Sequence, residues 1–156
     1  MTHETVFDHE KLQVYALSIE FQRWVGPVID HGLAKGRRLA ALKHLDEAST
    51  SISNNIAEGN GKRSAPDRCR FLDISRGSAL ECAACLDVLV ARGRLLPDTA
   101  KEGKTLLVRI VSMISKLIDR LGGAVRSSTS TSTSTSGRIW RYPASAAGAH
   151  TPNQVG

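Results

Sequence analysis

Aromatic residues make up only 4% of this 156-residue chain, although 41% of it is hydrophobic. A core with so few large rings must be aliphatic and built from closely packed helices. No apolar run approaches the roughly 18 residues that a membrane-spanning helix needs, and Met1-Thr2-His3-Glu4 lacks the basic-then-apolar pattern of a secretion signal. The cysteine count is three, an odd number. These absences predict a soluble, cytoplasmic protein with reduced thiols and no membrane role.

Recognisable catalytic and metal-binding patterns are also missing. The one C-x-x-C pair, Cys82 and Cys85, falls inside a predicted helix, whereas a redox motif needs a strand-to-helix turn and a structural zinc site needs two more ligands. Core packing of these thiols is the main interpretation, with adventitious metal or redox chemistry left open. The five histidines form no ligand pair at helical spacing, and there is no Gly-x-Ser-x-Gly elbow. We therefore expect no enzyme activity, no catalytic residues, no cofactor and no metal site.

Four segments carry the three-four apolar spacing of bundle helices. The first is expected to begin at Asp8 as an N-cap and to kink or end early at Gly26-Pro27, because proline removes a backbone donor. The second is expected from Arg37 to Glu58, and Gly59 and Gly61 are expected to stop it. Their predicted inner faces are Val14, Leu17, Phe21, Trp24 and Val28 in the first, and Leu42, Leu45, Ser49, Ile52 and Ile56 in the second.

The third predicted helix starts at Ser64, a cap with Asp67 three residues on and Pro66 in the first turn, and runs to about Arg92. Small residues lie in the middle of its inner face, which predicts the closest helix-helix contact of the fold there. That face comprises Phe71, Ser75, Ser78, Cys82, Cys85 and Leu89.

Gly93 is expected to end the third helix, and Pro97-Asp98 to begin the fourth, which should stop at Gly122-Gly123. The fourth helix carries Leu107, Ile110, Ile114, Leu117 and Leu121 on one stripe, backed by Val111 and Ile118 on a second. The second stripe predicts a subunit interface. Four helices with short connections predict an all-α, antiparallel, up-down-up-down bundle over residues 1–125.

Residues 126–156 are expected to form a disordered tail. Ser127 to Ser136 contain only Ser and Thr, a low-complexity run that cannot bury apolar surface. The tail holds Arg126, Arg138 and Arg141 and no acidic residue, so half of the net charge of +6 lies outside the bundle.

Two groups of polar residues on the second and third helices are candidates for a site. One is the set Asn55, Glu58, Ser78 and Glu81, which an antiparallel helix pair would bring together; a satisfied hydrogen-bond network that fixes helix register is the main interpretation. The other is the basic set Lys62, Arg63, Arg68, Arg70 and Arg76 around the second turn. Asp67 and Asp73 are interleaved with it, so an anion-binding patch and a solvated face both remain open.

The order of these motifs resembles one family. Lys11-Leu12-Gln13-Val14-Tyr15, Ser51-Ile52, Asn55-Ile56-Ala57-Glu58-Gly59, Gly61-Lys62-Arg63, Arg70-Phe71-Leu72 and Arg76-Gly77-Ser78 with Glu81 are similar to motifs of the four-helix bundle proteins encoded in intervening sequences of bacterial large-subunit rRNA genes. Relatives include the accessory variability determinant of diversity-generating retroelements. The resemblance spans roughly Phe7 to Leu121.

The resemblance implies a ring-like homo-oligomer, a pentamer, with a basic surface suited to RNA or an RNA-DNA hybrid. In the retroelement branch it implies a reverse transcriptase as partner. Asp46-Glu47 stand where the family usually has a basic pair, which favours modest affinity. Two functions are therefore expected: a nucleic-acid-binding accessory protein, or an oligomeric scaffold that binds another protein and has no nucleic-acid role.

Overall fold

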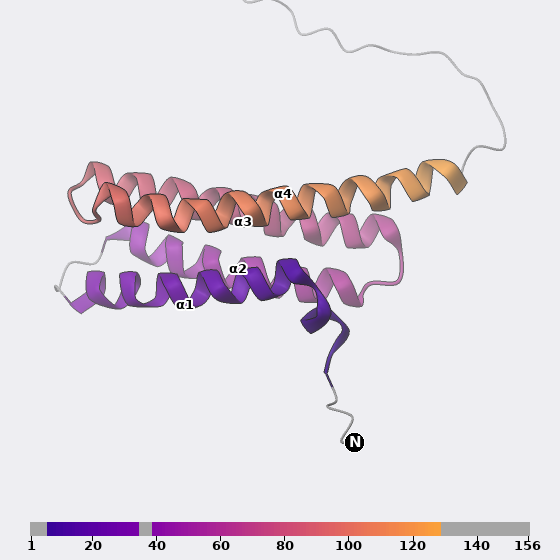
Figure 1. Ribbon diagram of the computed structural model, residues 1–156, viewed down its shortest axis with the longest axis horizontal. Coiled ribbons are helices and arrows are strands. Elements are labelled where there is room, and N and C mark those ends of the chain that lie inside the picture. The colour runs from indigo at the N-terminus through magenta and orange to yellow at the C-terminus, as the bar shows by residue number, and fades with distance from the viewer. Residues whose placement is uncertain (1–5, 35–38, 129–156) are drawn as a thin grey trace, which may run out of the picture.

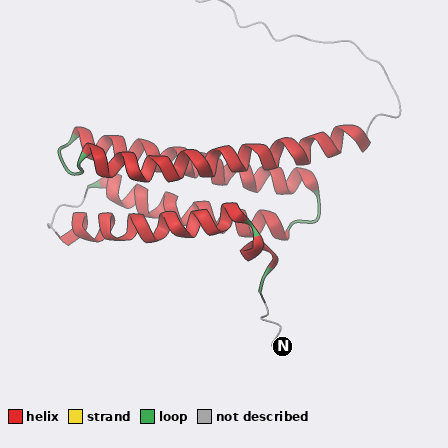
Figure 2. Cartoon of the chain, viewed as in Figure 1, coloured by secondary structure: helices red, strands yellow, loops and turns green. Residues whose placement is uncertain are grey.

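The computed structural model describes residues 6–34 and 39–128. A short 3-10 helix, η1 (Asp8–Lys11), precedes α1 (Gln13–Ala34), α2 (Ala40–Gly61), α3 (Ala65–Ala91) and α4 (Pro97–Ser128). In the view of Figure 1, α1 and α2 form a lower pair and α3 and α4 an upper pair. Each helix packs against its neighbours in sequence, and α1 also packs against α4, which closes the bundle. The predicted all-α, up-down-up-down four-helix bundle is confirmed, and the described residues contain helices and loops only (Figure 2).

The core is aliphatic, as expected. Its largest fully buried side chains include Leu45, Ile52, Ile56, Leu86 and Ile110, and Phe21 is the one aromatic ring among them. The most extensive helix contact lies between α2 and α3, where Ser75, Ser78 and Cys82 of α3 are buried. The small residues predicted on the inner face of α3 therefore lie in the most extensive helix contact of the fold.

The beginning and the inner face of α1 differ from the prediction. Phe7, not Asp8, is the cap of η1, and the α-helix begins only at Gln13 because Leu12 has extended backbone. Trp24 and Val28 are half-buried, while Val25 and Ile29 occupy the core. From Leu17 to Ile29 the buried apolar residues of α1 therefore recur every four positions.

Pro27 lies inside α1 and does not end it. The lost backbone bond belongs to the carbonyl of Arg23, and both Arg23 and Pro27 are exposed, so water can satisfy that carbonyl. Burial of Val25 and Ile29 on either side of the proline holds the helix together. The expected early end at Gly26-Pro27 is wrong for this reason.

Neither Gly59 nor Gly61 stops α2. Both are helical, and the chain leaves the helix at Lys62, which has extended backbone and donates its N–H to the carbonyl of Gly59. Gly59 is buried because the backbone of α3 approaches it: a Cβ atom built there would lie 2.9 Å from the Cβ of Phe71. Glycine is needed here for close helix packing rather than for a left-handed turn.

Gly93 does end α3 as predicted. Its φ of 62° is the left-handed conformation that glycine adopts without steric cost. The N–H of Arg94 bonds to the carbonyl of Leu89 at 2.8 Å, and the N–H of Gly93 bonds to the carbonyl of Val90 at 2.9 Å. This paired arrangement satisfies the last carbonyls of the helix and turns the chain into α4.

The fourth helix starts at Pro97 as predicted but continues through Gly122 and Gly123 to Ser128. The expected boundary between residues 125 and 126 therefore falls within a helix. Val111 and Ile118, from the second apolar stripe, are half-buried against the core. The predicted linker and tail beyond Ser128, with Trp140 and Tyr142, lie outside the described residues.

No helix in the described ranges is both long enough and apolar enough to span a bilayer.

Candidate nucleic-acid interface

The turn between α2 and α3 is a defined structure. The backbone N–H of Asp67 donates to the Oγ of Ser64 at 3.2 Å, which caps the start of α3, and Pro66 occupies the first turn as predicted. On the other side, Phe71 packs against Gly59. The basic residues of this turn therefore lie on two helix ends that pack against each other.

Lys62 is held in place by two contacts. Its Nζ lies 3.0 Å from a carboxylate oxygen of Glu58 and 4.6 Å from the centre of the Phe71 ring. The ion pair is partly exposed, so it contributes little to stability and can exchange for a phosphate. The aromatic face fixes the direction of the ammonium group at the outer edge of the turn.

The remaining four basic residues divide into two groups. Arg63 and Arg70 are exposed and have no ion pair within the described part of the chain, and Arg68 donates to the amide oxygen of Asn60 at 3.3 Å. Arg76 pairs with Asp73 at 2.7 Å and follows Arg70 by six residues, about 9 Å farther along the helix. Lys62, Arg63, Arg68 and Arg70 therefore lie at the α2-α3 turn and the start of α3, and we name them the basic corner, whereas Arg76 lies farther along α3 and is paired.

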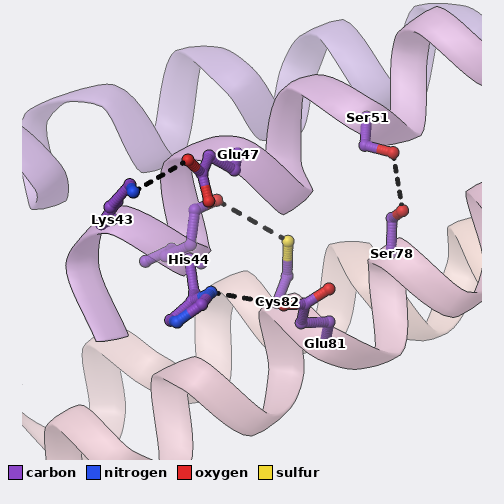
Figure 3. Close-up of polar contacts among 8 residues, drawn as sticks. Lys43, His44, Glu47, Ser51, Ser78, Glu81 and Cys82 are labelled. Carbon is purple, nitrogen blue, oxygen red and sulfur yellow. Dashed lines mark hydrogen bonds and ion pairs between the residues drawn. The ribbon is translucent and has the colours of Figure 1, made fainter. Parts of the chain in front are cut away.

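The predicted polar set forms a smaller network than expected. Asn55 donates from Nδ2 to the carbonyl and Oγ of Ser51, and the Oγ of Ser51 lies 2.8 Å from the Oγ of Ser78 on α3 (Figure 3). Ser51 is thus the link between Asn55 and Ser78. Ser51 is absent from the set predicted from the sequence. Its i,i+4 spacing to Asn55 is the signal that could have predicted this contact.

Glu58 and Glu81 do not belong to this network. Glu58 pairs with Lys62, and Oε1 of Glu81 lies 3.8 Å from Nδ1 of His44 on the solvent side of the helix pair (Figure 3). Both contacts are partly exposed; the first lies at the end of α2, and the second joins α2 to α3. The expected four-residue cluster is therefore wrong, since Glu58 pairs with Lys62 and Glu81 faces His44 instead.

The cysteine pair is packed in the core. Burial raises the pKa of the Cys82 thiol to about 12 and also raises that of Cys85, so neither is a nucleophile near neutral pH. The Sγ of Cys82 lies 4.0 Å from the carbonyl of Leu45 on α2 (Figure 3). Within the described ranges, no three His, Cys, Asp or Glu residues gather as metal ligands would.

The chain matches the model of the 23S rRNA-intervening sequence protein family over residues 10–116. It belongs to this family. The matched residues include the whole basic corner and the Asn55–Ser51–Ser78 network, and they end before the last turns of α4. No curated protein matches the chain.

A solved structure of the same general fold is similar to this family member. It is the 1.70 Å crystal structure of a protein of unknown function from the S23 ribosomal protein family of Bacteroides thetaiotaomicron VPI-5482. The two share 20% sequence identity with a TM-score of 0.64, and the match covers 67% of this chain and 97% of the other. At this identity the likeness establishes the bundle fold.

Proposed function

We propose that this family member is a non-enzymatic, homo-oligomeric bundle that binds nucleic acid through the basic corner. The observation that supports this most directly is the exposure of Arg63 at the α2-α3 turn and of Arg70 near the start of α3, without acidic partners among the described residues. Arginine presents a fixed fork of donors that matches phosphate geometry. Lys62 stands beside them on the face of Phe71.

A single corner has limited attraction for a polyanion, because residues 1–125 carry only about half of the net +6. An oligomer would repeat the corner once per subunit, and the summed potential would then extend over a large surface. Binding through phosphates in this way depends little on base sequence and falls steeply with salt. RNA or an RNA-DNA hybrid, with a reverse transcriptase as the protein partner, is the setting that the retroelement relatives suggest.

The test is fluorescence anisotropy with a structured RNA and an RNA-DNA hybrid at two salt concentrations. Arg63→Glu/Arg70→Glu should weaken binding at least tenfold at low salt and make the salt dependence shallower, because two phosphate contacts are removed. The matched control is Arg92→Glu/Arg94→Glu, which makes the same charge change at exposed residues of the opposite turn. Equal loss in both variants would point to net charge alone, and unchanged binding in both would exclude the basic corner.

A protein scaffold is the second candidate. Ile74, Leu80 and Val88 are exposed on the outer face of α3, where a solvated helix would carry polar residues. An apolar strip of this kind suits a protein partner better than a nucleic acid. If the parent protein binds neither the RNA nor the RNA-DNA hybrid at low salt, the scaffold function remains as the candidate.

A further inference from the structure

A groove on the outer side of α3 and α4 combines apolar and basic side chains. It has a volume of about 540 Å³, and Val90, Ala100 and Val108 contribute its apolar surface. Val108 is 65% exposed, so its apolar side chain buries little surface within its own subunit. Lys101, Lys104 and Arg109 line the same groove. Asp87 is the acidic residue of the lining and pairs with Lys104, so two net positive charges remain.

The other exposed apolar side chains of interest lie at the N-terminal end. We name residues 6–11 the N-terminal arm; in it, Phe7 is 73% and Val6 44% exposed. The Phe7 ring stacks on the His9 ring at 5.7 Å between centroids, and the His9 ring packs edge-on against Tyr15 at 4.7 Å. These contacts hold the Phe7 ring in place although it is exposed to solvent. Asp8 and Glu10 outweigh Lys11, which leaves the arm with a net negative charge. The arm is therefore apolar and acidic where the groove is apolar and basic.

The arm cannot occupy the groove of its own subunit. Trp24 of α1 packs over Gly103 of α4, which places Trp24 level with the groove residues Lys101 and Lys104. Gln13, the first residue of α1, is eleven positions before Trp24, about 16 Å along the bundle at about 1.5 Å per residue. Figure 1 shows the arm below the N-terminal end of α1, where η1 packs against α1 and α2 on the side of the bundle away from α3 and α4.

We infer that the N-terminal arm of one subunit docks in the α3-α4 groove of a second copy. This inference rests on the homo-oligomer of the proposed function and names the contact that builds it. Phe7 and Val6 cover Val108 and the apolar surface beside it, and Asp8 and Glu10 face Lys101 and Arg109. Arm and groove are different surfaces, so the contact is head-to-tail, and repeating it generates a ring when the rotation closes.

The test measures mass by multi-angle light scattering. The parent should have a mass several times 16.8 kDa. Val6→Ser/Phe7→Ser in the arm and Val108→Asp in the groove should each give monomers, while circular dichroism shows an unchanged fold because all three side chains are exposed. Leu33→Ser, an exposed apolar residue outside both surfaces, is the control and should keep the parent mass.

Mixing the two monomeric variants gives the decisive result. The groove variant still has an intact arm, and the arm variant still has an intact groove, so one productive contact remains and the mixture should contain dimers and nothing larger. A mixture that stays monomeric would overturn the inference. Loss of assembly in Val108→Asp, with the arm variant keeping the parent mass, would also overturn it, because another segment would then fill the groove.

The parent mass separates this inference from the proposed function. A monomeric parent overturns both the homo-oligomer and the arm contact. An oligomeric parent whose mass is unchanged in the arm and groove variants overturns the arm contact and leaves the homo-oligomer intact. Unchanged mass together with weaker RNA binding by Val108→Asp would assign the groove to nucleic acid and overturn the inference.

Discussion

Close approach of α2 and α3 depends on individual small residues. The Oγ of Ser75 donates to the carbonyl of Ile52 at 2.9 Å, so a buried hydroxyl joins the two helix backbones directly. A buried hydroxyl needs such a partner, because an unsatisfied one is costly. Gly59 has no side chain at the point where the end of α2 meets Phe71.

We predict that Gly59→Ala destabilises the protein. The new Cβ would lie 2.9 Å from the Cβ of Phe71, an atom fixed to the backbone of α3 that cannot swing away. Overpacking of this kind costs about 1–3 kcal/mol, more than the roughly 1 kcal/mol that alanine gains in helix propensity. Urea denaturation should therefore show a lower midpoint.

Gly61→Ala is the matched control for this change. Gly61 is also helical, and a Cβ there meets nothing within 4 Å. It should leave stability unchanged or raise it by up to about 1 kcal/mol. If both alanine variants were stabilised, the close contact with Phe71 would be disproved.

At the scale of elements, the helices are held by their buried faces rather than by their ends. The cap of α2 at Leu39 has no side-chain hydrogen bond, whereas Ser64 caps α3. Nevertheless α2 forms a helix of 22 residues, because Leu42, Leu45 and Ile52 pack into the core.

We predict that Ile52→Asp lowers the free energy of unfolding by at least about 3 kcal/mol, since it removes a buried aliphatic side chain and leaves a charge without a partner. Ile52 is 0% exposed. The control is Asn54→Asp on the exposed face of the same helix, expected within about 0.5 kcal/mol of the parent. Thermal melts that coincide for Ile52→Asp and parent would mean that this face of α2 is not in the core.

At the scale of the whole molecule, part of the positive charge lies after the last residue of α4. Arg138 and Arg141 follow the last described residue, and Trp140 lies between them. Arginine and aromatic side chains in one short segment are suited to phosphates and unpaired bases. The tail can therefore add affinity to that of the bundle.

We predict that deleting Thr129–Gly156 leaves helicity and oligomer mass unchanged and weakens nucleic-acid binding severalfold at low salt. Circular dichroism, light scattering and anisotropy on one preparation test the three points. A deletion variant with parent mass and unchanged affinity would confine binding to the bundle. Loss of assembly would instead show that Trp140 or Tyr142 docks on the helices.

The sequence alone determined the number of helices, the buried face of α2 and the two turns marked by Ser64 and by Gly93 with Pro97. These features are local: the spacing of apolar residues, a capping hydroxyl and a left-handed glycine act within a few residues of each other. The basic corner was predictable for the same reason, because Lys62, Arg63, Arg68 and Arg70 lie within two turns of a helix end.

Only the tertiary structure decided which residues face a neighbour. Val25 and Ile29 displaced Trp24 and Val28 from the core, and Pro27 stayed helical, because α2 and α4 pack on that side of α1. Gly59 reads as a helix stop in the sequence and is a packing residue in the fold, since the chain that contacts it is twelve positions away at Phe71. Spacing along one helix carries no information about the partner's position, and that position determines the role of these residues.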